Sequence, residues 1–210
     1  MTETETCEAI GDELRAAPRI SLMLRAAKLT AATGEYLCIL RDVSATGLKA
    51  KLFHPLPEQG PFAIELGTGE SYRLELVWER DGHAGFRFRD GPIDLTALVD
   101  EAGHFPKRQL RLALNRPVVI TANAINLPAT LSNLSQHGAL IELDFPLALR
   151  QLVQVGGGEL PVRHGRVLWR QGKLHGLVFS DGFRLDELAM LVARIQNRPQ
   201  SSGSPQRVHH

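Results

Sequence analysis

Two segments of the chain recur at one constant offset of 91 positions. The first pair is DVSATG (42–47) and NLSQHG (133–138), in which the serine and the glycine align. The second pair is VWERDGHAGFRFRD (77–90) and LWRQGKLHGLVFSD (168–181), which share Trp, Gly, Phe and Asp at matching places. One offset that holds across two separated segments indicates a tandem duplication. The chain therefore has to fold as two similar units, each spanning about half of the 210 residues.

Each copy consists mostly of short alternating runs. In the first copy they are LMLRAAKL, EYLCIL, LKAKLF, FAIEL, YRLELVW and GFRF, and PVVITAN, ATLSNL, GALIEL, VQV, GRVLW and GLVF follow in the second. Clusters of Gly, Pro, Asp or Asn separate them, which is typical of strands in a small barrel or sandwich. Helical spacing of apolar residues then predicts a helix at the end of each copy, over 93–103 and 185–198.

The composition is that of an ordinary soluble globular protein, with 43% hydrophobic residues and a net charge of +1. That charge implies no bulk attraction to nucleic acid or to a membrane. The apolar runs are too short to span a bilayer, and the acidic residues 1–14 do not form a secretory signal. Cys7 and Cys38 make no disulfide framework, which favours a reducing, cytoplasmic location. The polar end of the chain, 199–210, is expected to be disordered.

A polar pair, Asp42 and Ser44, stands where the run EYLCIL ends. Residues two apart in a strand point to the same face, so the pair presents a carboxylate beside a hydroxyl. Gly47 is expected to help close the hairpin, because glycine tolerates positive φ. Two interpretations remain open for the pair: a turn that satisfies its own backbone, or a binding surface.

Two arginines, Arg15 and Arg19, lie upstream in the segment LRAAPR (14–19). Pro18 disfavours a helix there, so the pair is expected on a loop or arm before the first strand. A guanidinium suits phosphate oxygens and the O6/N7 edge of guanine. A carboxylate suits the N–H donors of guanine. Two arginines together with an aspartate and a serine therefore match a ligand that has guanines and phosphates. Two arginines alone are more commonly part of a solvated, basic segment at the start of a domain.

The order R-x-x-x-R, then D-x-S-x-x-G 23 residues later, then W-x(6)-G-x-x-F resembles the PilZ domain family. The resemblance implies small β-barrels that bind the bacterial second messenger cyclic di-GMP. Arg15 and Arg19 would then grip phosphates and guanine edges, Asp42 and Ser44 would hydrogen-bond a guanine, and Gly47 would let the backbone turn beneath the ligand. Trp78 would border the pocket, or else serve in packing at the barrel rim.

The second copy departs from this pattern in its arm, PKRQLR (106–111). Lys107 takes the place of the first arginine and Arg111 that of the second, while Arg108 could substitute by a slip of one residue. The ammonium of a lysine is a point charge and cannot form the two parallel hydrogen bonds that a guanidinium makes to a guanine edge. We therefore expect a weak or silent second site, with the second copy acting as a scaffold, an interdomain partner or an output surface. The residues of that site are Lys107, Arg108, Arg111, Asn133, Ser135 and Gly138.

The expected fold is mainly β, with two tandem small antiparallel barrels, each followed by a helix. The expected divisions are an acidic tail (1–14), a first PilZ-like domain (15–103), a second (104–198) and a disordered tail (199–210). The scattered histidines have no metal-binding spacing, and no catalytic signature is present, so neither a metal, a cofactor nor an enzyme is expected. The resemblance implies a switch that signals to a downstream protein partner when cyclic di-GMP binds.

Two other classes stay open. One is a ligand-independent adaptor on the same fold, which some PilZ domains are. The other is a small barrel that binds single-stranded nucleic acid, which uses a basic groove with exposed aromatic residues. Aromatic residues make up only 6% of this chain and its net charge is near zero, so no nucleic-acid polymer is expected as a partner.

Overall fold

The computed structural model describes residues 20–57, 60–65, 69–95 and 109–197, with side chains from Arg25 onward. The chain divides into two compact units, residues 1–110 and 111–210. The arginines of the predicted arm, Arg15 and Arg19, lie outside the described residues, as do Lys107 and Arg108. The domain boundaries expected from the sequence remain predictions.

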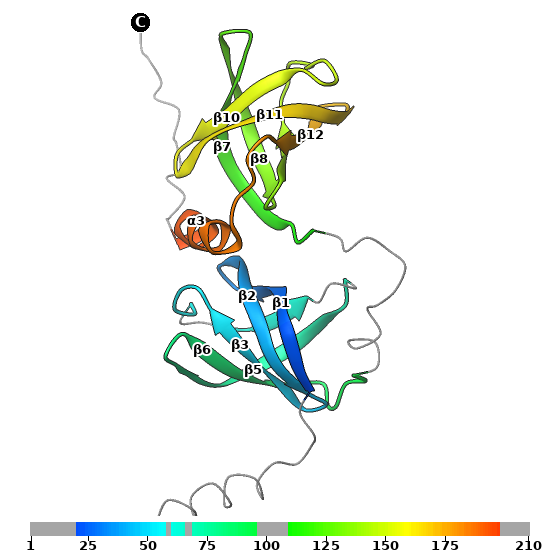
Figure 1. The fold of residues 1–210 in the computed structure, drawn as a ribbon, viewed down its shortest axis with the longest axis vertical. Coiled ribbons are helices and arrows are strands. Elements are labelled where there is room, and N and C mark those ends of the chain that lie inside the picture. Colours follow the sequence, from blue (N-terminus) through cyan, green and yellow to red (C-terminus); the bar gives the residue numbers. More distant parts are fainter. Residues whose placement is uncertain (1–19, 58–59, 66–68, 96–108, 198–210) are drawn as a thin grey trace, which may run out of the picture. The chain divides into compact units, whose positions relative to one another are not determined.

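The first unit is a closed antiparallel barrel with the strand order β1-β2-β3-β6-β5-β4 (Figure 1). Its strands are β1 (Ile20–Ala31), β2 (Gly34–Ser44), β3 (Gly47–Leu52), β4 (Phe62–Glu65), β5 (Ser71–Arg80) and β6 (His83–Phe88). The barrel closes where β1 pairs with β4, for example Leu29 with Ile64.

The second unit repeats this barrel. Its strands are β7 (Leu112–Ala122), β8 (Ile125–Leu134), β9 (Gly138–Glu142), β10 (Leu152–Gly157), β11 (Leu160–Gln171) and β12 (Leu174–Phe179). Their order, β7-β8-β9-β12-β11-β10 around the closed barrel, is the order of the first unit. The structure thus confirms a mainly β fold built of two similar antiparallel barrels, and barrels rather than sandwiches.

The alternation of the sequence decides which side chains fill each barrel. In β3, Leu48, Ala50 and Leu52 are buried, whereas the residues between them stay partly exposed. The matching strand β9 buries Ala139 and Ile141 in the same way. A period of two is what a strand needs to present one apolar face to the core.

An ion pair bridges three strands where the first barrel closes. Lys28 of β1 places its Nζ 2.6 Å from Glu65 of β4 and 3.1 Å from Glu35 of β2. Burial lowers the pKa of Lys28, but the hydrogen bonds to both carboxylates outweigh it, so the pKa is raised above its ordinary value. The lysine therefore stays charged and links both neighbours of β1.

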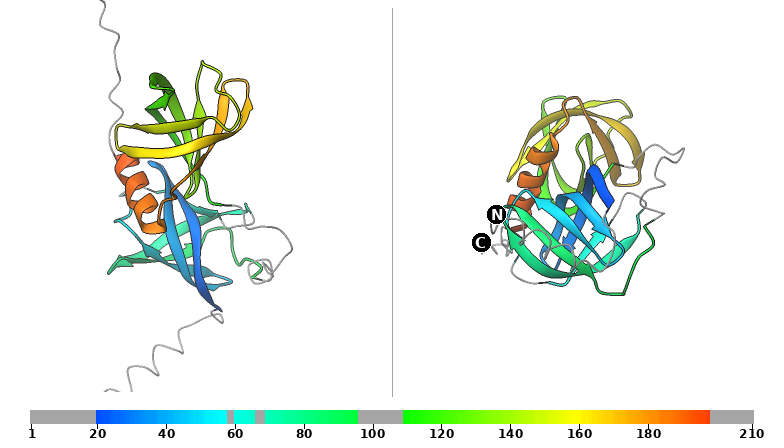
Figure 2. Two further views of the ribbon diagram at one scale, coloured as in Figure 1. Left: turned by 45° about the horizontal axis from the view of Figure 1, so that its top comes forward. Right: turned by 60° about the horizontal axis from the view of Figure 1, so that its bottom comes forward.

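The predicted C-terminal helix is present as α3 (Leu185–Asn197), which lies beside the turn between β10 and β11 (Figure 2). The backbone N–H of Arg184 donates to Oε2 of Glu187 at 3.0 Å, which caps the first turn. At the other end, Nη2 of Arg116 donates to the carbonyl of Ile195 at 2.6 Å. Of the helix predicted over 93–103, residues 93–95 are not helical, and the rest lies outside the described residues.

No helix in the part of the chain that the structure describes is long and apolar enough to cross a membrane.

His175 is a fully buried histidine whose two ring nitrogens both bond the backbone. Nε2 accepts the N–H of Leu147 at 3.3 Å, and Nδ1 lies 2.8 Å from the carbonyl of Lys173. An acceptor at Nε2 and a donor at Nδ1 describe a neutral ring. The ring therefore anchors the loop between β9 and β10 to β12.

We expect His175→Ala to lower the free energy of unfolding of the second unit by about 2–4 kcal/mol. The change leaves the buried N–H of Leu147 without its acceptor and opens a cavity. Each unit holds one tryptophan, so urea unfolding followed by Trp169 fluorescence in a Trp78→Phe background reports this unit alone. His164→Ala, at an exposed position of the same unit, should change stability by no more than about 0.5 kcal/mol. Equal effects of both substitutions would contradict the anchoring role.

Candidate ligand-binding face

The motif turn joins β2 to β3 in the first barrel. Ser44 and Gly47 pair across it, with Ala45 and Thr46 at its tip. The Ser44 side chain is buried, and its Oγ donates to the carbonyl of Gly47 at 3.2 Å. In the second barrel, Ser135 donates to the carbonyl of Gly138 at 3.1 Å. The serine hydroxyl is thus engaged within its own turn in both copies.

Gly47 has a different role from the one expected. Neither Thr46 nor Gly47 has a positive φ, so the prediction that the glycine turns through that region was wrong. A Cβ at Gly47 would lie well under 3.0 Å from the carbonyl oxygen of Phe86 on β6, and one at Gly138 equally close to that of Leu177 on β12. Glycine is required here because the backbone of the neighbouring strand comes too close for any side chain.

Asp42 lies on the outer side of β2, opposite Lys49 of β3. Asp42 pairs with Lys49 and Ser44 pairs with Gly47, and the members of each couple, Asp42/Ser44 and Gly47/Lys49, are two positions apart on their strand. Asp42 and Ser44 therefore lie on one face of the sheet, as predicted. A register shift between Leu40 and Asp42 inserts Arg41 as a bulge residue. In the described part of the chain, the Asp42 side chain has no hydrogen bond or ion pair, and Nε of Arg41 is buried without a partner. Both side chains therefore retain hydrogen-bonding capacity.

One transverse row of residues crosses four strands of the outer surface. Asp42 of β2 pairs with Lys49 of β3, Lys49 with Gly85 of β6, and Gly85 with Trp78 of β5. The Trp78 ring occupies the space in which a Gly85 side chain would stand. Trp169 covers Gly176 in the same way in the second barrel. This contact explains the repeated W-x(6)-G spacing and puts Trp78 on the same face as the motif turn.

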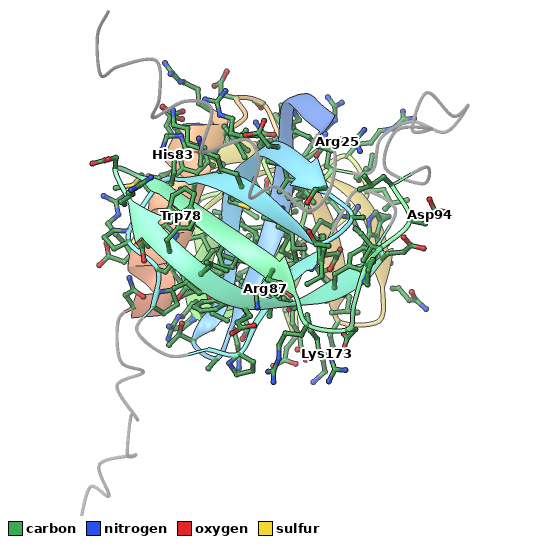
Figure 3. All side chains as sticks on the ribbon, turned by 90° about the horizontal axis from the view of Figure 1, so that it is seen from below. Arg25, Trp78, His83, Arg87, Asp94 and Lys173 are labelled. Atoms are coloured by element: carbon green, nitrogen blue, oxygen red, sulfur yellow. The ribbon has the colours of Figure 1, made fainter. Side chains whose placement is uncertain are left out.

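We call this outer surface of the first barrel the basic face. We define it by six residues around this row, four cations (Lys49, Lys51, Arg80 and Arg87) and two carboxylates (Asp42 and Glu75). Two further exposed charges of β5 are already engaged: Arg73 pairs with Asp90, and Glu79 accepts the N–H of Leu56. The Arg80 guanidinium lies 5.2 Å from the centre of the Trp78 ring. Figure 3 looks onto β5 and β6 from outside, with Trp78 and Arg87 toward the viewer.

The matching surface of the second barrel has lost this charge. At the offset of 91, the four cations become Leu140, Glu142, Gln171 and Val178, and the two carboxylates become Asn133 and Arg166. These six positions of the second barrel thus hold one cation, Arg166, and one carboxylate, Glu142. Sequence reasoning missed the cations of the basic face, although the alternation in LKAKL and the replacement of Lys49 by Leu140 were visible signals.

The segment that leaves each barrel is hydrogen-bonded to the motif turn. In the first unit, the N–H of Phe88 donates to the carbonyl of Thr46 at 3.0 Å, and the N–H of Ile93 to that of Ala45 at 2.8 Å. In the second, Phe179 and Phe183 donate to the turn at 2.8 and 2.7 Å. The motif turn is thus directly hydrogen-bonded to the end of the barrel in both units.

Asp90, just after β6, and Cys38, in the core of the first barrel, are among the groups with clearly shifted pKa values. Nε of Arg73 donates to Oδ2 of Asp90 at 2.9 Å, and Nη2 bonds the other oxygen, so the pKa of Asp90 is lowered. Burial raises the pKa of the Cys38 thiol, in β2, to about 12. Asp90 is thus a fixed anion just after β6, and Cys38 stays protonated at neutral pH.

A pocket of about 640 Å³ lies next to the start of β4. It is lined by Gly60, Pro61, Phe62, Leu74, Glu75, Leu76 and Arg89. It shares only Glu75 with the basic face, and none of Asp42, Ser44, Gly47 and Trp78 lines it. Among the described residues, no group of His, Cys, Asp and Glu could hold a metal ion.

The structure places Asp42, Ser44 and Gly47 together at the β2–β3 turn, with Trp78 on the same face but three strands away from Asp42. It places Asn133, Ser135 and Gly138 together at the β8–β9 turn, with Trp169 three strands away from Asn133. Arg111 is exposed and directly precedes β7, whereas the other arm residues lie outside the described parts.

Comparisons with known proteins give matches among solved structures alone, since no protein-family model and no curated protein matches the chain. One match is the Borreliella burgdorferi PlzA protein in complex with c-di-GMP, at 12% identity and a TM-score of 0.36, covering 92% of this chain and 99% of that one. Escherichia coli YcgR in complex with c-di-GMP matches at 13% identity and a TM-score of 0.30, over 81% and 83% of the two chains. The K. pneumonia MrkH–c-di-GMP complex matches at 11% identity and a TM-score of 0.31, over 92% of each chain. All three TM-scores lie below 0.5, so the likeness by itself assigns no function.

One matching structure describes MrkH as a c-di-GMP-dependent transcription regulatory factor. The expectation that no nucleic-acid polymer binds therefore receives no support from these comparisons.

Proposed function

We propose that the chain is a tandem PilZ-type protein that binds cyclic di-GMP on the basic face of its first barrel. The observation that carries this proposal is the asymmetry between the two copies. Both keep the serine–glycine turn and the Trp-over-Gly contact, but the six positions of the basic face hold four cations in the first copy and one, Arg166, in the second. The turn and the Trp–Gly contact occur in both barrels and are explained by the fold. The cations of the basic face are not required by the fold, so we attribute them to ligand binding.

The chemistry of the face suits a guanine dinucleotide. The Asp42 carboxylate can accept hydrogen bonds from the N–H donors of a guanine edge. Lys49 and Arg87, on adjacent strands, can neutralise phosphate oxygens. Arg15 and Arg19, on the segment that leads into β1, would close over the ligand from the other side. Ser44 contributes chiefly by holding the turn, since its hydroxyl already donates to Gly47.

The second barrel would be silent toward this ligand. Lys107 replaces an arginine in its arm, Asn133 replaces the carboxylate, and Leu140 and Val178 replace two cations of the face. Ten of the twelve large apolar side chains exposed among the described residues belong to this unit. That distribution favours protein contact as its role and supports the second candidate function, a ligand-independent adaptor.

The mechanism we infer is switching rather than catalysis. A ligand that binds better to one arrangement of the arm and turn shifts the population toward it. The Ile93–Ala45 hydrogen bond links the motif turn to the segment between the two units. The response would then reach a downstream protein partner. The free, buried Cys38 fits a reducing compartment such as the cytoplasm.

Isothermal titration of cyclic di-GMP into the full chain tests this proposal, with GTP as the control ligand. We expect saturation at one ligand site per chain and no binding of GTP. Two saturable sites would show that the second barrel binds as well. No binding by a folded sample would contradict the receptor function and leave the adaptor.

A further inference from the structure

The first fourteen residues form the most uneven stretch of charge in the chain. They carry five acidic residues and no basic one: Glu3, Glu5, Glu8, Asp12 and Glu13. The basic face of the first barrel has the opposite charge, with four cations against two carboxylates. The six matching positions of the second barrel hold one cation and one carboxylate, so they offer a weaker attraction.

The chain enters the first barrel on the row that crosses the basic face. Ser21 of β1 pairs with Asp42, which pairs with Lys49. Neighbouring strands lie about 4.8 Å apart, so Lys49 is roughly 10 Å and Trp78 roughly 20 Å from β1 along this row. An extended chain reaches about 3.3 Å per residue, so Glu13, eight residues before Ser21, has a reach of roughly 26 Å. The acidic residues can therefore cover the whole row.

We propose that residues 3–13 dock on the basic face as an intramolecular anion and compete there with the proposed ligand. The competition rests on the proposed function, whereas the docking does not. Charge complementarity is the reason for choosing this segment as the occupant of the basic face. All charged residues of the segment are acidic, and the segment is joined to β1 at the edge of that face.

The tether and the charges together set the strength of this contact. Tethering gives the segment a high effective concentration at the face. Exposed ion pairs are individually weak, so a ligand that makes bidentate contacts can displace the segment. Occupation of the face by the segment reduces the apparent affinity for the ligand to the intrinsic affinity multiplied by the unoccupied fraction. The segment would thus set the ligand concentration at which the protein responds.

Docking can be measured without any ligand by a fluorophore on Cys7. Cys38 is fully buried with its pKa raised to about 12, so a maleimide label should react at Cys7. A bimane label is quenched on contact with an indole ring, and Trp78 stands on the basic face. We expect quenching at low salt, and its loss in about 0.5 M NaCl, where charges are screened beyond roughly 4 Å.

Substitutions locate the contact. Trp78→Phe should remove the quenching, and Trp169→Phe should leave it intact, because Trp169 lies on the face without the cations. The pair Lys49→Leu and Arg87→Val introduces the residues of the second barrel and should also remove it. An unquenched label in the wild-type chain at low salt, or quenching by Trp169, would overturn the docking.

Competition is measured by neutralising the segment. Converting its five acidic residues to Gln or Asn should strengthen cyclic di-GMP binding by about 3- to 10-fold at low salt and leave it unchanged in about 0.5 M NaCl. Thr4→Ser with Thr6→Ser, in the same segment, should change nothing. Unchanged affinity in the neutralised chain would overturn the competition even if the ligand binds. If no variant binds the ligand, the proposed function fails, while the quenching still decides the docking.

Discussion

Replacing Arg19 by alanine is expected to weaken cyclic di-GMP binding by roughly 5- to 150-fold, because a bidentate guanidinium contact to a guanine edge contributes about 1–3 kcal/mol. A lysine at this position would not restore the affinity, since its single ammonium cannot form the forked pair. Titration calorimetry of the variant, made in the 210-residue chain, measures the change. Far-UV circular dichroism of the same sample establishes that it is folded.

The second copy supplies the matched control for this experiment. Arg111 takes the corresponding place before β7, next to a face that has lost its cations. We expect Arg111→Ala to bind cyclic di-GMP as the wild type does. If Arg111→Ala weakened binding and Arg19→Ala did not, the site would lie on the second barrel. If neither did, the assignment of the arm would be wrong even for a chain that binds the ligand.

Much of the fold could be predicted because its information is local and repeated. The period of two in LKAKL and its counterparts marks strands, and the apolar spacing from Leu185 onward marks α3. The offset of 91 then requires two similar units. Closure of each sheet into a barrel was not decided by these patterns, because it depends on the pairing of β1 with β4 and of β7 with β10.

The site was predicted only in part, because a strand's register cannot be counted from its own sequence. Asp42 and Ser44 share a face, as alternation predicts, yet the bulge at Arg41 shows how one inserted residue could have separated them. Lys49 and Arg87 join the site through pairing across β3 and β6, which are more than 30 residues apart in sequence. Long-range pairing of this kind leaves no mark in a single stretch of sequence.

His175 was missed for a related reason. A histidine inside an alternating run gives no sign of whether its ring faces water or the core. Its partners, Leu147 and Lys173, come from a loop and a turn that only the closed barrel brings together. The structure shows both ring nitrogens engaged by backbone groups.

Gly138→Ala is expected to destabilise the second unit by about 3 kcal/mol. The added Cβ would stand well under 3.0 Å from the carbonyl oxygen of Leu177. This backbone atom cannot move aside as a side-chain tip can, because Leu177 is paired with β9 on one side and β11 on the other. Overpacking of this kind typically costs about 1–3 kcal/mol and more where the backbone must shift. Urea unfolding of the Trp78→Phe background, followed by Trp169 fluorescence, measures the effect on this unit.

A matched pair of variants separates this clash from a conformational effect. If glycine were needed here for positive φ, Asn would be tolerated better than Ala, because Asn visits that region more readily. Since the observed cause is the approach of β12, Asn and Ala should be similarly harmful at position 138. At Gly172, where φ is +57 and no atom lies within 4 Å of a Cβ, Asn should be the milder substitution. A mild Gly138→Asn beside a harmful Gly138→Ala would show that the turn, and not the neighbouring strand, selects glycine in this motif.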